Sequence, residues 1–145
     1  MQTMASSIAV SSKTSPYIST YPWSSTGFGT KFSDPGTAPP GKGYGVAFTV
    51  KNNAIAVAHY GTPFVSTYPW SGTGFGSKFS NPGTLPAGKG YGVAFTNAVD
   101  AIAVAHYGTP FVSTYPWSGT GFGTKKSDPG TLPASTGFSA ASRRT

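Results

Sequence analysis

The sequence predicts an all-β protein, and three observations carry that prediction. Glycine (20 residues) and proline (13) recur along the 145 residues, and they interrupt every helical pattern. Short runs alternate aromatic or β-branched side chains with small ones, which is the period-two pattern of half-buried strands. The chain also repeats itself every 47 residues, as the related motifs that begin at Pro16, Pro63 and Pro110 show.

Each repeat contains four strand-like runs, which we call A, B, C and D. In the middle copy they cover residues 44–49, 54–60, 64–70 and 74–80. Val46 and Phe48 alternate with small residues in run A, and Ile55 and Val57 do so in run B. Run C is rich in aromatic and β-branched residues, and we expect its strand to end or bulge at Pro69. Turn-forming residues separate the runs.

Four antiparallel strands in a unit of about 40–50 residues have the dimensions of one β-propeller blade. A blade buries both faces only by stacking on neighbours, typically in a ring of about 4–8. We expect one repeat domain over 1–145. Its expected parts are blade 1 (runs B, C and D, 7–33), blade 2 (44–80), blade 3 (91–127) and an A-like run (137–143).

Three blades cannot close a ring by themselves. We therefore expect the run 137–143 to act as a clasp strand that completes blade 1 of a partner chain. Two chains would then form a six-bladed homodimeric ring, which we prefer to a trimer because nine blades exceed the usual range. An open arc that aggregates and a fragment of a longer parent chain are the alternatives.

Composition excludes several classes of protein. The absence of cysteine excludes disulfides and cysteine-ligated metals. The net charge of +7 suits an anionic partner, but the basic residues are scattered, so we interpret the charge as solubilising and do not expect nucleic-acid binding. No apolar run reaches membrane-spanning length, and the N-terminus does not resemble a signal peptide. The cellular location stays open.

The polar residues do not predict an enzyme, a cofactor or a metal site. Asp34 and Asp128 occupy the same repeat position two blades apart, so we interpret them as turn residues rather than paired catalytic acids. His59 and His106 are also repeat equivalents and lack nearby metal ligands in the sequence. The Gly-Lys-Gly segments at 41–43 and 88–90 are not followed by a helix, as a phosphate-binding loop would require.

The strings GYGVAFT, AIAVAH and PFVSTYPW, in that order, resemble the WD-type propeller repeat. The resemblance covers the whole chain and implies that Trp23, Trp70 and Trp117 match the tryptophan of that repeat. Serine follows each of them where the family has aspartate, and the family's Gly-His pair is absent, so the hydrogen-bonded tetrad of that family is not expected. The sequence also resembles WD-like repeats encoded by bacterial viruses. This resemblance implies a virion or phage-associated component, in the particle or the bacterial host cytoplasm.

Our first functional hypothesis is a non-enzymatic structural or protein-interaction module, whose partners are a second copy and other virion proteins. The alternative is a glycan-binding lectin with one shallow aromatic site per blade. Its candidate ligand-binding residues are Trp23, Trp70, Trp117, Tyr68, Tyr115, His59 and His106. Lys31, Lys78 and Lys125 would protect the outer edge strand or form a polyanion-binding rim. Segments 63–87 and 110–134 differ at only three positions, which also admits a designed chain without a biological ligand.

Overall fold

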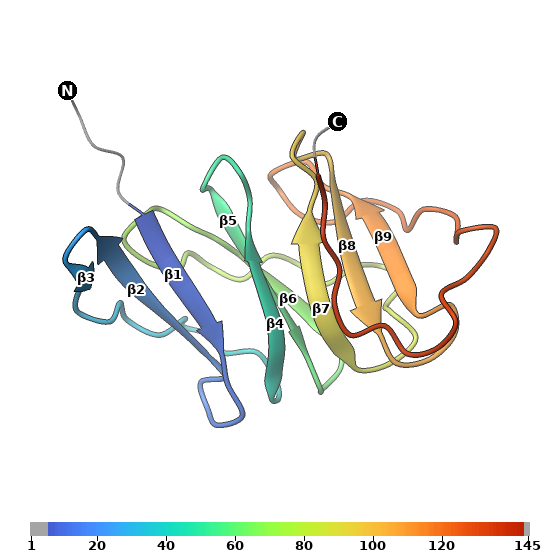
Figure 1. The fold of residues 1–145 in the computed structure, drawn as a ribbon, viewed down its shortest axis with the longest axis horizontal. Coiled ribbons are helices and arrows are strands. Elements are labelled where there is room, and N and C mark those ends of the chain that lie inside the picture. The colour runs from blue at the N-terminus through green and yellow to red at the C-terminus, as the bar shows by residue number, and fades with distance from the viewer. Residues whose placement is uncertain (1–5, 144–145) are drawn as a thin grey trace.

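The computed structural model describes residues 6–143, and this part of the chain is all-β, as predicted. It folds into three antiparallel sheets of three strands each, and no helix occurs between residues 6 and 143 (Figure 1). The strands are β1 (Ser6–Ser11), β2 (Ile18–Ser24), β3 (Gly27–Phe28), β4 (Gly43–Phe48), β5 (Ala54–His59), β6 (Val65–Pro69), β7 (Gly90–Phe95), β8 (Ala101–His106) and β9 (Val112–Pro116).

The strands follow the predicted runs closely. Runs A, B and C of the middle repeat form β4, β5 and β6, and β6 ends at Pro69 as expected. The same three runs of the last repeat form β7, β8 and β9 in an identical register. In the first sheet, β1 and β2 are runs B and C, so β1 is the repeat equivalent of β5 and β8.

Run D differs from the prediction of a full fourth strand. It contributes the two-residue strand β3 to the first sheet and single bridges, Trp70 to Phe75 and Trp117 to Phe122, in the other two repeats. Scattered backbone bonds still hold it along run C, such as the amide of Phe79 to the carbonyl of Thr67 at 2.9 Å. The ladder is interrupted because Pro69 and its equivalents have no amide hydrogen to donate.

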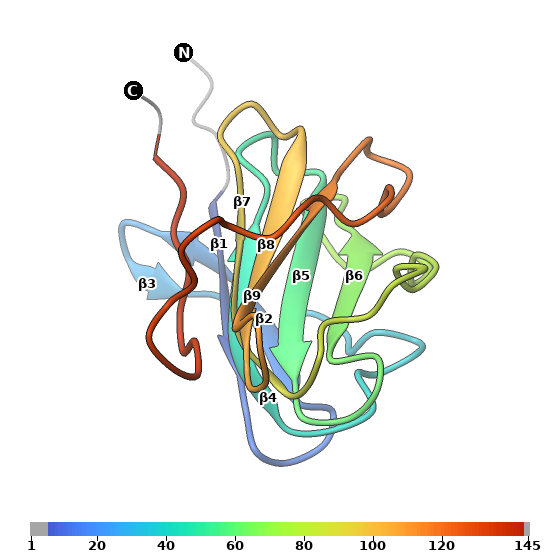
Figure 2. The same ribbon diagram turned by 90° about the vertical axis from the view of Figure 1, so that its right-hand side faces the viewer.

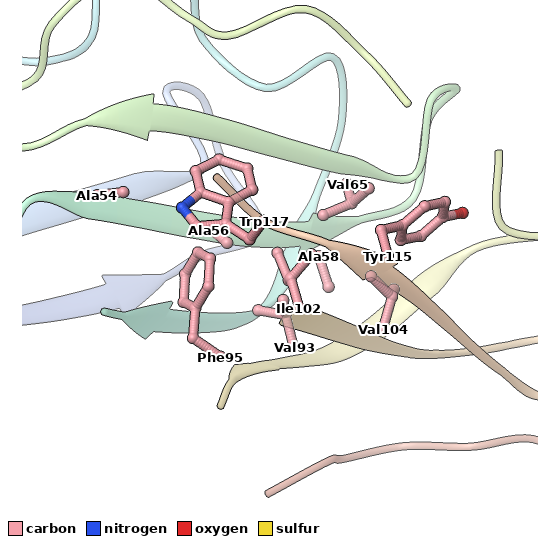
Figure 3. Close-up of a cluster of buried hydrophobic side chains, with 10 residues drawn as sticks. All are labelled: Ala54, Ala56, Ala58, Val65, Val93, Phe95, Ile102, Val104, Tyr115 and Trp117. Atoms are coloured by element: carbon pink, nitrogen blue, oxygen red, sulfur yellow. The ribbon is translucent and has the colours of Figure 1, made fainter. Parts of the chain in front are cut away.

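The hydrophobic core lies between neighbouring sheets rather than within one. The three sheets follow one another side by side in chain order, and β4 and β7 are adjacent (Figures 1 and 2). One cluster joins the second and third sheets and includes Ala56, Phe95, Ile102 and Trp117 (Figure 3). A second cluster joins the first and second sheets around Trp70. Each sheet therefore needs a neighbour to bury its faces.

The tryptophans pack between repeats wherever a preceding repeat is present. Trp70 meets Phe32 of the first repeat edge-to-face at 5.4 Å, and Trp117 meets Phe79 of the second at 5.2 Å. Both tryptophans are 3% exposed. Trp23 belongs to the first repeat and is 41% exposed.

Glycine permits the closest approach between successive repeats. A Cβ atom on Gly90 would lie 2.2 Å from the carbonyl oxygen of Phe64, far inside van der Waals contact. Gly43 and Gly137, its repeat equivalents, stand against the carbonyls of Tyr17 and Phe111 in the same way. The start of each A run therefore crosses the turn between strands B and C of the preceding repeat.

Candidate functional site

Six of the seven residues predicted for ligand binding are buried in the described chain. Those with almost no accessible surface are Tyr68, Trp70, Tyr115, Trp117, His59 and His106. A ring that is packed on both sides cannot stack on a sugar, so these six side chains offer a glycan no accessible face. Trp23 keeps an accessible face, and it is the one residue of the set to which the lectin hypothesis can still apply.

The two histidines link neighbouring strands within their sheets. The Nε2 atom of His59 lies 2.8 Å from the Ser66 hydroxyl across the pair of strands β5 and β6, and His106 lies 2.9 Å from Ser113 in the same arrangement. Burial lowers the pKa of His59 to about 4, against an ordinary value of 6.5, so this imidazole is neutral at physiological pH. A neutral, fully enclosed histidine bonded to a serine acts as a structural crosslink.

The two tyrosines connect successive repeats. The hydroxyl of Tyr68 donates a hydrogen bond of 2.8 Å to the carbonyl of Thr37 in the preceding repeat, and Tyr115 does the same to Thr84 at 2.7 Å. Burial raises the pKa of Tyr115 to about 12, so its hydroxyl keeps the proton that it donates.

The run D lysines each pair with the side chain three residues later in the chain. Lys31 is ion-paired with Asp34 and Lys125 with Asp128, both three residues apart. Lys78 bonds the side-chain amide of Asn81 instead, because the middle repeat has no aspartate there. Asp34 and Asp128 thus each neutralise the lysine three residues before them. Whether the lysines protect an edge stays a prediction.

The Gly-Lys-Gly segments are held to the end of strand B. The carbonyls of Lys42 and Lys89 accept hydrogen bonds from the amides of Tyr60 and Tyr107 at 3.0 and 2.9 Å. The Lys89 ammonium also lies over the Tyr60 ring, 4.5 Å from its centre, which joins two repeats through a cation–π contact. Sequence reasoning missed this contact, although the recurring Lys and Tyr at the 47-residue offset could have indicated it.

The feature that the fold leaves without a strand partner is the segment 137–143. It runs along β7 outside the three sheets (Figure 1). The amide of Gly137 bonds the carbonyl of His106 at 3.1 Å, just as Gly43 bonds Ser12 at 2.9 Å. Its Phe138 ring lies 5.2 Å from Tyr91, continuing the contact of 5.0 Å between Tyr44 and Tyr91. The segment therefore occupies the A position of a fourth repeat.

The opposite end of the row of sheets carries the matching edge. Strands β5 and β8 each pair on both sides, whereas β1, their equivalent, pairs with β2 alone among residues 6–143. Val10 in β1 is 47% exposed, while its equivalents Val57 and Val104 are fully buried. We therefore take β1 and the segment 137–143 together as the candidate functional site, a surface for association.

Metal binding and membrane insertion through a helix are not supported by the described residues. No group of three or more potential metal-ligating side chains occurs between residues 6 and 143. Within the same part of the chain, no helix has the length and apolar character to cross a membrane. The indole nitrogens of Trp70 and Trp117 have no hydrogen-bond partner there, so the tetrad of WD-type repeats is not formed at these positions.

Comparison with known proteins identifies no family for this chain. No protein-family model matches the sequence, and no curated protein matches it either. The resemblance to WD-type repeats therefore stays a prediction.

Proposed function

We propose that this protein is a non-enzymatic interaction module that assembles by exchanging a strand between copies. The segment 137–143 of one chain adds to the free edge of β1 in another, and two chains close a six-bladed β-propeller of WD-like repeats. The module then presents the faces of the ring to protein partners, as a structural component of a virus particle would.

The observation that supports this proposal is the match between the two free elements. Segment 137–143 already sits one repeat beyond β7, at the place where an A strand begins. Among residues 6–143, one edge of β1 has no strand partner, and such an edge favours the addition of a further strand. Each chain supplies one such strand and one such edge, so the same contact forms at both junctions of a two-chain ring.

The register of the exchanged strand follows from the internal sheets. Val46 faces Val57 and Phe48 faces Ile55 in the pair of strands β4 and β5. The 47-residue period maps these pairs onto Ala140 with Val10 of the partner subunit, and Ser142 with Ile8 of the partner subunit. Small side chains on the incoming strand place no bulk against β1.

The absence of a catalytic role is part of the same proposal. The buried histidines and the paired aspartates all have structural partners on the described chain. A general acid or base must reach a substrate, whereas the two histidines are fully enclosed and each of these aspartates is ion-paired with a lysine.

The solution mass tests the proposal directly. We expect light scattering coupled to size exclusion to give twice the chain mass of 14.8 kDa, with a concentration-dependent shift to the single chain on dilution. Removal of residues 137–145 should leave only single chains or irregular aggregates. A chain that ends at Arg143 is the control and should still form the dimer.

Two results would reject the proposal. One is a soluble single chain at every accessible concentration. The other is a dimer that survives the removal of residues 137–145, because a different surface would then be responsible.

A further inference from the structure

We infer that Lys126 of one copy covers Trp23 of the other, so that a cation–π contact replaces, at the junction between copies, the aromatic contact found inside each chain. This inference rests on the proposed assembly and names the contact that gives the junction its own chemistry.

The internal interfaces define what a tryptophan needs at this position. Trp70 is surrounded by three phenylalanines, two from its own repeat and one from the preceding repeat. Trp117 has the three equivalent neighbours one repeat later, which are Phe79, Phe95 and Phe122. Trp23 has one of them, Phe28, at 5.0 Å. It is accordingly 41% exposed, against 3% for the other two.

The phenylalanine of the preceding repeat is held in place by its backbone. The amides of Phe32 and Phe79 bond the carbonyls of Thr20 and Thr67, each at 2.9 Å. In the third repeat, Lys126 makes the same bond to Thr114 at 2.8 Å. Lys126 therefore starts from the backbone position from which Phe32 and Phe79 reach the next tryptophan, and its side chain is exposed.

The repeat also identifies the other residues at this junction. The second missing phenylalanine corresponds to Ser142, and the carbonyl that would accept from the Tyr21 hydroxyl belongs to Thr131. Ser142 is too small to fill the space next to Trp23. The indole face is therefore left for a longer side chain, and Lys126 can lay its alkyl stem and ammonium across it.

Lys126 fits this role better than its neighbour does. The adjacent Lys125 is ion-paired with Asp128, whereas Lys126 has no salt bridge among the described residues. Indole is the best aromatic partner for a cation. The aromatic residue that is lost from the repeat is thus exchanged for a cation, which an exposed indole face can bind.

A double-mutant cycle on the dimer dissociation constant tests the contact. We expect Lys126→Gln to weaken association roughly 10- to 100-fold, and Trp23→Leu to do the same, because a partly desolvated cation–π contact is worth roughly 3- to 10-fold and the homodimer contains it twice. The dimer dissociation constant of the double variant should be no larger than the larger of the two single-variant constants. Lys125→Gln is the matched control and should dissociate like the natural chain.

Two further readouts separate this contact from a general loss of structure. Trp23 is the accessible tryptophan among the three, so acrylamide should quench a fraction of the fluorescence in the single chain, and that fraction should be protected on assembly. Lys126→Phe restores the internal type of contact, so it should recover association and make it less sensitive to salt.

The outcomes distinguish this inference from the proposed function. Normal association of Lys126→Gln, or additive effects in the cycle, would overturn the contact between Lys126 and Trp23 and leave strand exchange standing. A natural chain that never associates would overturn the strand exchange itself, and this contact with it.

Discussion

At the scale of single residues, the repeat turns polar and aromatic side chains into structural parts. His59 and His106 crosslink strands through serine hydroxyls, and Tyr68 and Tyr115 bond the loop of the preceding repeat. Trp70 illustrates the energetics, because a side chain of this size that is 3% exposed contributes several kcal/mol by burial. The side chains whose residue type suggests ligand binding thus serve packing and hydrogen bonding within the fold.

Replacement of Trp70 by alanine should lower the free energy of unfolding by about 3–5 kcal/mol, because it empties a site lined by three aromatic rings. Denaturant titration measures the change. Phe28→Ala is the control, since Phe28 is 60% exposed and its loss should cost less than about 1 kcal/mol. Equal stability of the Trp70 variant and the natural chain would contradict the burial described here.

His59 should make stability depend on pH. Its pKa of about 4 in the folded chain lies below the ordinary 6.5, so the unfolded chain binds the proton first as the pH falls. The stabilising contribution is therefore complete above pH 6.5 and is lost between 6.5 and about 4. A shift of this size corresponds to roughly 3 kcal/mol.

Thermal unfolding between pH 7 and pH 5 measures this dependence. His59→Ser, which copies Ser12 of the first repeat, should flatten the curve. An unchanged slope in this variant would show that another group is responsible.

At the scale of elements, tight contacts between repeats depend on glycine at the start of run A. Gly43, Gly90 and Gly137 each face a backbone carbonyl where a Cβ atom has no space. The contact joins strand β7 to the turn between β5 and β6, so it sets how far one sheet stands from the next. Backbone atoms cannot move aside as a side chain can, and this makes the position intolerant of any larger residue.

Gly90→Ala should therefore destabilise the fold by about 1–3 kcal/mol through overpacking. Chemical denaturation is the measurement. Gly83→Ala provides the control, because a Cβ atom there meets nothing within 4 Å, and its effect should stay within about 0.5 kcal/mol. Identical stabilities for the two variants would mean that the sheets can separate without cost.

At the scale of the whole molecule, the three sheets form a row with two unlike ends. One end shows the free edge of β1 and the half-exposed Trp23, and the other shows segment 137–143 and Phe138, which is 69% exposed. Exposed apolar surface and unpaired strand edges favour association. In the proposed assembly, the complementarity of the two ends would direct this association toward a second copy.

A synthetic peptide with the sequence of residues 137–145 should compete for the edge of β1. Added in excess, it should lower the average solution mass toward that of a single chain with bound peptide, as light scattering can follow. A scrambled peptide of the same composition is the control. Competition by the scrambled peptide, or none by either, would speak against strand exchange at β1.

The local pattern was enough to predict the strands. Alternation in runs A and B places β4, β5, β7 and β8 within a residue or so of their observed bounds, and proline marks the end of β6. Run D was overestimated, because aromatic residues suggested a strand while the prolines opposite had no amide to pair with it. The candidate ligand-binding residues follow from residue type, and burial is a property that residue type alone does not give.

Period-two alternation and turn-forming residues establish the all-β class from the sequence, because both are local signals. The 47-residue period establishes the number of repeats and the equivalence of residues between them. Which side chains face a neighbour and which face solvent depended on the packing of one sheet against the next. The same tryptophan is enclosed in two repeats and open in the first, since only a folded neighbour can remove its surface from water.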